Sequence, residues 1–336
     1  GNPLIDVIVD CSDEEIAGFG LAKGTMHLIE PDRGQELLSA LATKEKRYSC
    51  GGSAPNTMIA LATFGTEAAL GGTIGTDDLG AIYDEQLQTN GVVSNVTAAA
   101  GPTGTSIIMV TPDSERTMNT HLGTCRLFTR DDLRADLIDA AEYLYFTGYM
   151  WDTDGQKDAI LAAIERAQAS KTTIVFDVAD PFAVERYRDD FRTLIAGPVD
   201  VLFANSSEAK LLIDAEDPEA AAAGLAEECR IAVVKDGANG SFVAEHDASV
   251  RPIAPYSVTP VDTTGAGDMY AGGFLHGLAQ GGGVEDAGTF ASYVAAKIIT
   301  SSGAQLSADA ADEVRRSRQY TAIAGTAAAG AATRDR

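Results

Sequence analysis

The chain has 336 residues, of which 45% are hydrophobic and 22% charged, a balance typical of a soluble globular protein with one sizeable α/β domain plus an elaboration. Its 49 acidic and 25 basic residues leave a net charge of −24, so the surface repels a phosphate backbone and we expect no nucleic-acid partner. No apolar run is long enough to cross a bilayer, and no charged-then-apolar leader precedes the first strand, so we expect a cytoplasmic protein with no membrane partner.

Along the chain, short β-branched runs alternate with segments of helical periodicity. Strands are predicted at 4–9, 67–73, 143–146, 173–176, 201–203 and 231–235. Helices are predicted between them at 55–64, 78–88, 156–169, 206–213 and 219–229. Such βαβ alternation favours a mostly parallel sheet with helices on both faces, and ligands then bind beyond the carboxyl ends of the strands.

Two stretches, near 12–50 and near 95–125, break this alternation. Their extended pieces at 25–29, 47–50, 106–111 and 116–121 have too little helix between them for parallel crossovers. We therefore expect a small antiparallel sheet that serves as a lid on a single domain covering residues 1–320. Two long surface loops are the alternative, although unstructured loops of that length are uncommon. The Ala/Gly-rich tail, 321–336, is expected to be poorly ordered.

The junction from Asp262 to Asp268 leads directly into an apolar helical stretch. Amides at the start of a helix have no intrahelical partner and bind anions, and Gly265 and Gly267 allow a phosphate to approach closely. The carboxylate of Asp268 could then take a proton from an attacking hydroxyl, as phosphoryl transfer to an alcohol requires. Taken alone, a glycine turn with an acidic residue that complements the helix dipole explains the same residues.

Other site classes find little support in the sequence. The four cysteines lack CxxC or Cys/His spacing, so we expect reduced thiols and no structural metal. The four histidines show no nucleophile-base pattern, and neither a GxxxxGK[ST] nor a GxGxxG motif occurs. Acidic pairs such as Asp77-Asp78 would suit a protein kept soluble at high salt, although a solvated acidic surface is the simpler explanation.

Two segments carry a family resemblance. Residues 262–275 (DTTGAGDMYAGGFL) and 51–65 (GGSAPNTMIALATFG) resemble the two signatures of the ribokinase, or phosphofructokinase B, family of ATP-dependent kinases, in the family's order and separation. The match continues through 75–80, 205–208 and 303–305, and so covers residues 1 to about 310. Within the family, the segments 1–6, 115–119 and 146–152 are similar to the adenosine kinase branch.

The resemblance implies a ribokinase-like α/β fold, in which helices flank both faces of a central, mainly parallel sheet and a small β-sheet forms the lid. It also implies transfer of the ATP γ-phosphate to the primary (5′) hydroxyl of a nucleoside, with adenosine as the preferred acceptor. Asp268 would be the base, and the amides of Gly265, Ala266 and Gly267 would stabilise the migrating phosphoryl group. A ribokinase- or fructokinase-like sugar kinase and a non-catalytic nucleotide-binding regulator remain alternatives.

The resemblance also assigns residues to the acceptor. Positions that match ribose contacts are Asn2, Asp6, Gly51, Gly52 and Asn56. Tyr149 would stack on the base, with Leu4, Met26, Met118 and Leu122 as candidate walls, and Arg116 would close over the site from the lid. Each of these assignments also has a structural explanation. Asn2 and Asp6 could be turn residues, Asn56 a helix cap, Tyr149 a core or rim residue, and Arg116 a solvent-facing charge.

On the nucleotide side, Asn205 and Glu208 match an NxxE element that organises Mg²⁺ through water, although a helix cap explains the same pair. The positions that would face ATP include Lys235, Gly237, Gly240 and Thr264, with Lys235 replacing the hydroxyl residue that the family uses. A monovalent cation such as K⁺ would be held by Asp262, Thr264, Ile298, Ser301, Gly303 and Ser307. We expect ATP and Mg²⁺ as cofactors, a small nucleoside or sugar as substrate, and a monomer or homodimer.

Overall fold

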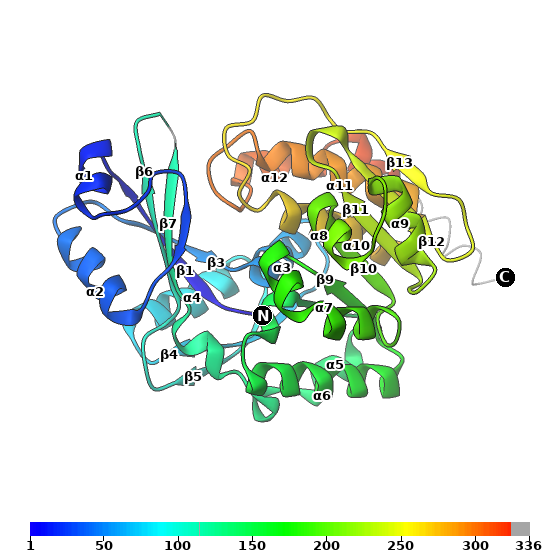
Figure 1. Cartoon of the computed structure of the whole chain (residues 1–336), viewed down its shortest axis with the longest axis horizontal. Coiled ribbons are helices and arrows are strands. Elements are labelled where there is room, and N and C mark those ends of the chain that lie inside the picture. The colour runs from blue at the N-terminus through cyan, green and yellow to red at the C-terminus, as the bar shows by residue number, and fades with distance from the viewer. Residues whose placement is uncertain (114, 324–336) are drawn as a thin grey trace.

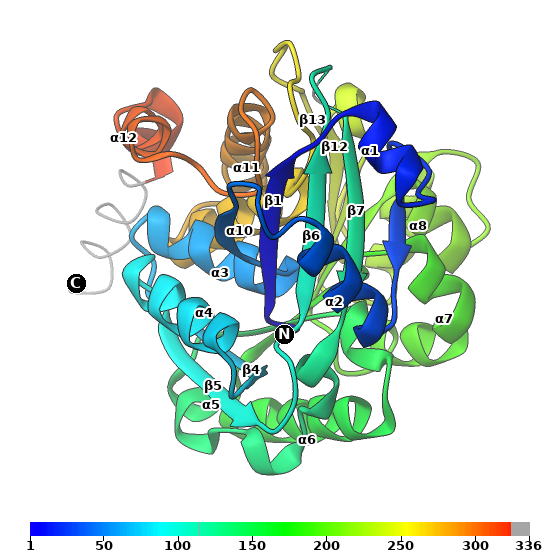
Figure 2. The ribbon, with the colours of Figure 1, turned by 90° about the vertical axis from the view of Figure 1, so that its left-hand side faces the viewer.

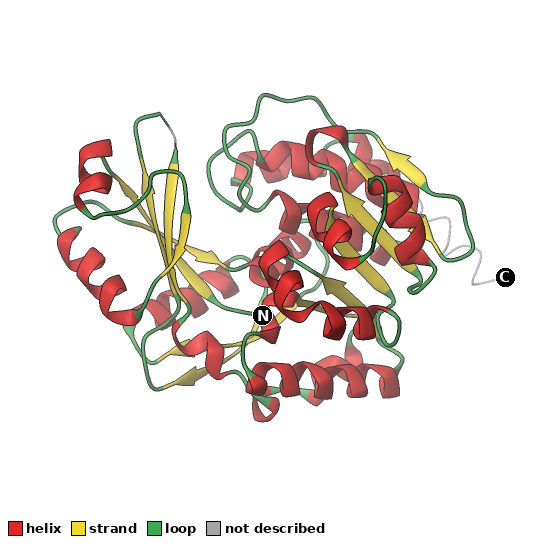
Figure 3. Cartoon of the chain, viewed as in Figure 1, coloured by secondary structure: helices red, strands yellow, loops and turns green. Residues whose placement is uncertain are grey.

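In the computed structural model, which describes residues 1–113 and 115–323, a large helix-flanked sheet stands beside a smaller one (Figures 1 and 3). Strands β8 to β11 of the large sheet are parallel, and β12 and β13 continue it antiparallel. In spatial order its strands are β13 (Arg251–Ile253), β12 (Ser241–Glu245), β11 (Ile231–Lys235), β10 (Val201–Asn205), β9 (Thr173–Asp177) and β8 (Tyr143–Thr147). The predicted central, mainly parallel sheet is confirmed.

The inner strands of the large sheet read as unbroken apolar runs because helices cover both of their faces. On one face lie α6 (Asp154–Ser170), α7 (Pro181–Ile195), α8 (Ser206–Leu212) and α9 (Pro218–Ala226). On the other lie α3 (Ser53–Thr63), α10 (Ala266–Ala279) and α11 (Val284–Ile298). Polar residues appear where the strands end, and parallel strands bring these ends to one edge of the sheet.

The small sheet is mixed and not purely antiparallel as expected. Its order is β2 (Met26–Leu28), β7 (Arg116–His121), β6 (Thr105–Val110), β1 (Leu4–Asp10) and β3 (Arg47–Gly51). Strand β1 pairs parallel with β6, and β2 pairs parallel with β7. The first strand, which the alternation placed among the parallel strands of the main domain, therefore belongs to the small sheet.

Helices α1 (Asp13–Gly18) and α2 (Pro31–Ala40) lie in a stretch where too little helix was expected. Both cover the outer face of the small sheet, away from the large sheet (Figures 1 and 2). There Ile16 and Leu37 pack in one cluster with Ile5 and Val7 of β1. The alternate residues of β1 and β7, which include Asp6 and Arg116, lie on the opposite, partly exposed face.

Further elements connect and close the structure. A parallel pair, β4 (Ala69–Gly75) and β5 (Val93–Ala99), is joined by α4 (Asp78–Thr89), so part of the stretch expected to form the lid pairs with β4 instead. The remaining helices are α5 (Ala135–Ala140) and α12 (Ala308–Arg315), and the 3₁₀ turns are η1 (Gly123–Leu127), η2 (Arg130–Asp132), η3 (Gly148–Trp151) and η4 (Gly237–Asn239).

Residues 321–323 are helical with Ile323 buried, and the rest of the predicted tail, 324–336, lies outside the described residues. Over the described parts of the chain, each helix is too short or too polar to cross a membrane.

Candidate active site

The glycine loop lies at the start of α10. Gly265 is the N-cap residue with φ +74°, and a Cβ placed there would lie 2.7 Å from the Cβ of Ala304, so the loop requires glycine. Among the described residues, no side chain accepts a hydrogen bond from the first turn of α10 as a cap. The amide of Ala266 donates to the carbonyl of Thr263 at 3.2 Å, whereas the amides of Gly267 and Asp268 have no partner within the described chain and are available to an anionic ligand.

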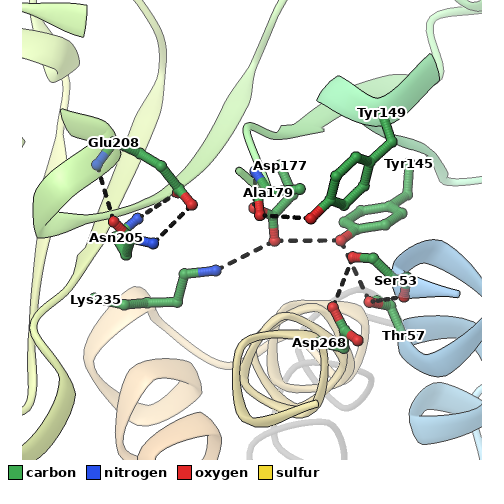
Figure 4. A network of polar contacts seen from close by, with 10 residues as sticks. All are labelled: Ser53, Thr57, Tyr145, Tyr149, Asp177, Ala179, Asn205, Glu208, Lys235 and Asp268. Carbon is green, nitrogen blue, oxygen red and sulfur yellow. Dashed lines mark hydrogen bonds and ion pairs between the residues drawn. The ribbon is translucent and has the colours of Figure 1, made fainter. Parts of the chain in front are cut away.

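Asp268 lies in that first turn and is held by α3, which packs beside α10 (Figure 4). Ser53 Oγ donates to its Oδ1 at 2.7 Å, and Asn56 Nδ2 donates to its Oδ2 at 2.9 Å. Burial raises the pKa of Asp268 to about 6, against the lowering effect of these two hydrogen bonds. The carboxyl group therefore combines fixed orientation with a pKa close to neutral, as a general base requires.

Sequence reasoning placed Asn56 on the sugar and gave Ser53 no role. In the structure Asn56 is 6% exposed and bonded to Asp268, while its buried Oδ1 has no hydrogen-bond partner within the described chain. Ser53 stands in the glycine-rich 51–65 segment, three positions before Asn56, and both face α10 from the first turn of α3. That helical spacing was the signal that could have identified Ser53.

The carboxyl ends of the large sheet's strands bring a second polar group to the same region (Figure 4). Asp177 ends β9, and its Oδ2 accepts from Lys235 Nζ and from Tyr145 Oη, each at 3.3 Å. Lys235 ends β11. Lys235 was predicted from the sequence as a site residue, whereas Asp177 and Tyr145 were not, although Asp177 follows from the rule that ligand-binding residues end parallel strands.

Asn205 and Glu208 form a capping box at the start of α8. Asn205 Oδ1 accepts from the amide of Glu208 at 2.9 Å, and the Glu208 carboxylate accepts from Asn205 N at 2.7 Å and Nδ2 at 2.6 Å. Burial, offset in part by Lys235, raises the pKa of Glu208 to about 7. The pair therefore forms the helix cap that was the alternative explanation. The same cap places the buried carboxyl group of Glu208 at the strand ends.

Arg116 links the small sheet to the glycine loop. Its Nη1 lies 3.0 Å from Asp262 Oδ2 and 3.4 Å from Thr264 Oγ1, and its Nη2 donates to Ser302 Oγ at 2.7 Å. The side chains of Arg116 and Asp262 are only 10% and 8% exposed, so Arg116 is not a solvent-facing charge. Asp262 also accepts from the amides of Thr264 at 3.0 Å and Gly303 at 2.7 Å, which joins the two loops that the resemblance assigns to a cation.

The other residues assigned to the cation have local roles. Ile298 ends α11, and its carbonyl accepts from the amide of Ser301 at 3.1 Å. Ser307 caps α12 by accepting from Ala310. In the described part of the chain, no three His, Cys, Asp or Glu side chains are grouped as a metal site would need. Within this set, Asp262 is hydrogen-bonded to both Thr264 and Gly303, and its bond to Gly303 is the one that joins the two loops.

The sugar-assigned residues of the small sheet converge at the ends of β1 and β3. A Cβ on Gly51 would lie 2.6 Å from Asp6 Oδ1, and a Cβ on Gly52, with φ +101°, would lie 2.2 Å from the carbonyl oxygen of Asn2. Gly52 is thus required by its backbone conformation and by the carbonyl of Asn2, whereas a side chain at Gly51 would displace the Asp6 carboxylate. Burial raises the pKa of Asp6 to about 7, with Arg116 lowering it and Asp268 raising it.

Asn2 and Tyr149 meet where β8 leads into η3. Asn2 Nδ2 donates to the carbonyl of Tyr149 at 3.4 Å, and Asn2 Oδ1 accepts from Gln156 Nε2 at 2.7 Å. Tyr149 Oη donates to the carbonyl of Ala179 at 3.3 Å, yet Tyr149 is 39% exposed and is not a core residue. Met118 is half-buried and pairs across the small sheet with Met26, which is 51% exposed.

The turn after Lys235 is built on two glycines. Gly237 and Gly240 have φ of +56° and +101°, and a Cβ on Gly240 would lie 2.2 Å from the carbonyl oxygen of Ile253. The amide of Asp236 donates to the carbonyl of Gly240 at 2.8 Å. These contacts fix the turn between β11 and β12 directly after the lysine.

The model of the pfkB family of carbohydrate kinases matches residues 14–311. The crystal structure of an adenosine kinase from Sinorhizobium meliloti superposes with a TM-score of 0.84 and 35% identity, covering 94% of this chain and 97% of that one. An ATP-dependent ribose-1-phosphate kinase from Halopiger xanaduensis is 32% identical over 84% of this chain and 91% of its own length. An adenosine kinase from Saccharomyces cerevisiae is 28% identical, with coverages of 90% and 94%.

Proposed function

Because the chain belongs to the pfkB family of carbohydrate kinases, as its two signature segments predicted, we propose that it transfers the γ-phosphate of ATP to the 5′ hydroxyl of a nucleoside, with adenosine as the preferred acceptor. ATP-dependent transfer to a hydroxyl group is the reaction class of the family. The observation that carries the residue assignment is the placement of the Asp268 carboxylate. Ser53 and Asn56 fix it beside the start of α10, which no side chain of the described residues caps.

The chemistry follows from that placement. Asp268 accepts the proton of the acceptor hydroxyl as the new oxygen–phosphorus bond forms and the bond from the γ-phosphorus to ADP breaks. The amides of Gly265, Ala266 and Gly267 donate to the phosphoryl oxygens, where negative charge accumulates. Ser53 and Asn56 hold the carboxylate in place, since each bonds a different oxygen.

Metal ions are part of the proposal. Glu208, a buried carboxylate held by Asn205 at the strand ends, would hold Mg²⁺ through water, and Mg²⁺ prefers one or two carboxylates together with retained waters. When bound, Mg²⁺ neutralises charge on the ATP phosphates. The carbonyl-rich loops around Asp262 and Gly303 would take a monovalent cation such as K⁺, which an assay with and without K⁺ tests directly.

The acceptor assignment rests on the small sheet. Asp6 and Asn2 lie beside the two close-packed glycines, Gly51 and Gly52, and a carboxylate with an amide suits the two hydroxyls of a ribose. The exposed ring of Tyr149 suits stacking on a base. Similarity to the Sinorhizobium adenosine kinase supports adenosine, whereas similarity to the Halopiger enzyme supports a sugar-phosphate or sugar acceptor as second candidate.

A coupled ADP-release assay over adenosine, inosine, guanosine, cytidine, ribose, ribose 1-phosphate and fructose tests the proposal, with Asp268→Asn as the control for contaminating kinases. We expect saturable turnover with adenosine that the variant abolishes. Turnover of a free sugar or sugar phosphate with none on nucleosides would transfer the assignment to the second candidate. Silence on every acceptor would favour a non-catalytic nucleotide-binding regulator.

A further inference from the structure

Lys235 places a positive charge beside the glycine loop. It ends β11, and its Nζ lies 3.4 Å from the position that a Cβ on Gly267 would occupy. The same Nζ lies 3.3 Å from Asp177 Oδ2, and the Lys235 and Asp177 side chains are 16% and 3% exposed. Figure 4 shows the ammonium group between the Asn205–Glu208 pair on one side and Asp177 and Asp268 on the other.

The surroundings of Lys235 keep it charged. Burial lowers the pKa of a lysine, but the carboxylates of Asp177, Glu208 and Asp268 outweigh that effect, so the pKa of Lys235 is raised. An ammonium group on a flexible stem offers three donors that can change partner. It can therefore leave Asp177 for a more highly charged anion that arrives at the start of α10.

We propose that Lys235 binds the γ-phosphoryl group of the nucleotide, and that Asp177 positions it for this contact. The inference rests on the proposed kinase function. As the bond from the γ-phosphorus to ADP breaks and the bond to the acceptor oxygen forms, negative charge is spread over the phosphoryl oxygens, and an ammonium group beside the Gly267 amide offsets it. The chain thus adds a cation at a position where the family pattern has a hydroxyl group.

Binding of two nucleotides separates this role from a structural one. Calorimetric titration of wild type and Lys235→Met compares MgADP with the non-hydrolysable MgAMP-PNP, which differ in the γ-phosphoryl group. We expect the variant to lose tenfold or more in affinity for MgAMP-PNP and less than twofold for MgADP. Equal losses for the two nucleotides, or no loss for either, would overturn the assignment. Lys210→Met, which removes an exposed lysine from α8, is the matched control and should change neither affinity.

Asp177 is tested as the positioning residue. Asp177→Asn should lower kcat more than it raises the KM for ATP, and it should have little further effect in a Lys235→Met background because the two residues act through one contact. Additive effects of the two substitutions would contradict the positioning role. Should Lys235→Met not fold, Lys235→Thr provides the same comparison of the two nucleotides, and Lys235→Arg should retain the preference for MgAMP-PNP.

The outcomes distinguish this inference from the kinase proposal. If wild-type protein phosphorylates an acceptor while Lys235→Met keeps the wild-type preference between the nucleotides, the inference alone is wrong. If wild-type protein phosphorylates none of the acceptors but shows a preference for MgAMP-PNP that requires Lys235, the contact stands and the catalytic proposal is wrong.

Discussion

The large sheet and the small sheet supply the site in different ways. Strands of the large sheet are covered on both faces, so their polar residues stand at the strand ends, where Asp177, Asn205 and Lys235 meet. Strands of the small sheet are covered on the outer face, so Asp6 and Arg116 lie along the inner, partly exposed face. The residues that we propose for the nucleotide side thus stand at strand ends, and those that we propose for the acceptor side stand on a sheet face.

The largest effect is expected where the two sides meet. Asp268→Asn should reduce kcat by 10² or more, since general-base help is worth about that much, while nucleotide affinity and fold are retained. Steady-state kinetics and calorimetric nucleotide binding measure the two quantities. If the variant retained more than about a tenth of the wild-type rate, Asp268 would not be the general base.

The acceptor side can be disturbed alone through Gly51. An alanine Cβ there would lie 2.6 Å from Asp6 Oδ1 and must displace that carboxylate. We expect Gly51→Ala to raise the KM for the acceptor about tenfold, the loss of roughly one charged hydrogen bond, with the KM for ATP unchanged. Gly18→Ala is the control because a Cβ at Gly18 meets nothing within 4 Å. Equal changes in both KM values would mean that the two sides are not separable.

The link between the sides is tested by Arg116→Met, which leaves Asp262 with its two amide donors but without its cation. Removing one member of a buried ion pair typically costs 3–5 kcal/mol, and we expect about 2 kcal/mol here because those amides remain. Urea unfolding monitored by circular dichroism measures the change. A variant with wild-type stability would show that the small sheet is held by its other contacts.

The pH dependence should differ between activity and stability. The pKa of Asp268 is raised to about 6, so kcat/KM should rise with pH through 6 as the base loses its proton, and reach a plateau near 8. Because the folded pKa lies above the unfolded value, this group stabilises the fold fully below about pH 4, and that contribution is lost as pH rises through 6. Asp268→Asn should therefore lose less thermal stability than wild type between pH 5 and pH 8. Parallel stability profiles for the two proteins would argue against the raised pKa.

The smallest effect is expected at Tyr149. Tyr149→Phe removes hydrogen bonds from a half-exposed hydroxyl group to Ala179 and Asp180 but keeps the ring. We expect the KM for adenosine to change less than about threefold, because such exposed bonds contribute little. Tyr149→Ala, which removes the ring, should raise it more. If the two variants behave alike, the ring does not contact the base.

The two sheets also differ in how far the sequence predicts them. The strand at Ile231–Lys235 was predicted with its observed bounds, because a buried parallel strand reads as an unbroken apolar run. In contrast, α1 escaped notice, although Ser12 and Glu15 form a capping box that marks its start. The parallel pairings of the small sheet join strands far apart in the sequence, β1 with β6 and β2 with β7, so local patterns could not reveal them.

The candidate site was predictable to a similar extent. The glycine loop and Asp268 stand together in sequence, so their proximity needs no tertiary information. Ser53 and Asp177 could not be assigned to the same cluster, since their positions depend on how α3 packs beside α10 and on the order of strands in the sheet. Arg116 was named, but its partner Asp262 lies far along the chain and became evident only from the folded structure.

One consequence of the Arg116–Asp262 contact is heterotropic linkage. The guanidinium group comes from the strand face that carries Asp6, and the carboxylate holds the amides of Thr264 and Gly303 next to the glycine loop. If ligands on both sides change this contact, each must alter the affinity for the other, and thermodynamics requires the factor to be the same in both directions. The affinities for the two ligands would then be coupled through one ion pair, and the two subsites would not bind independently.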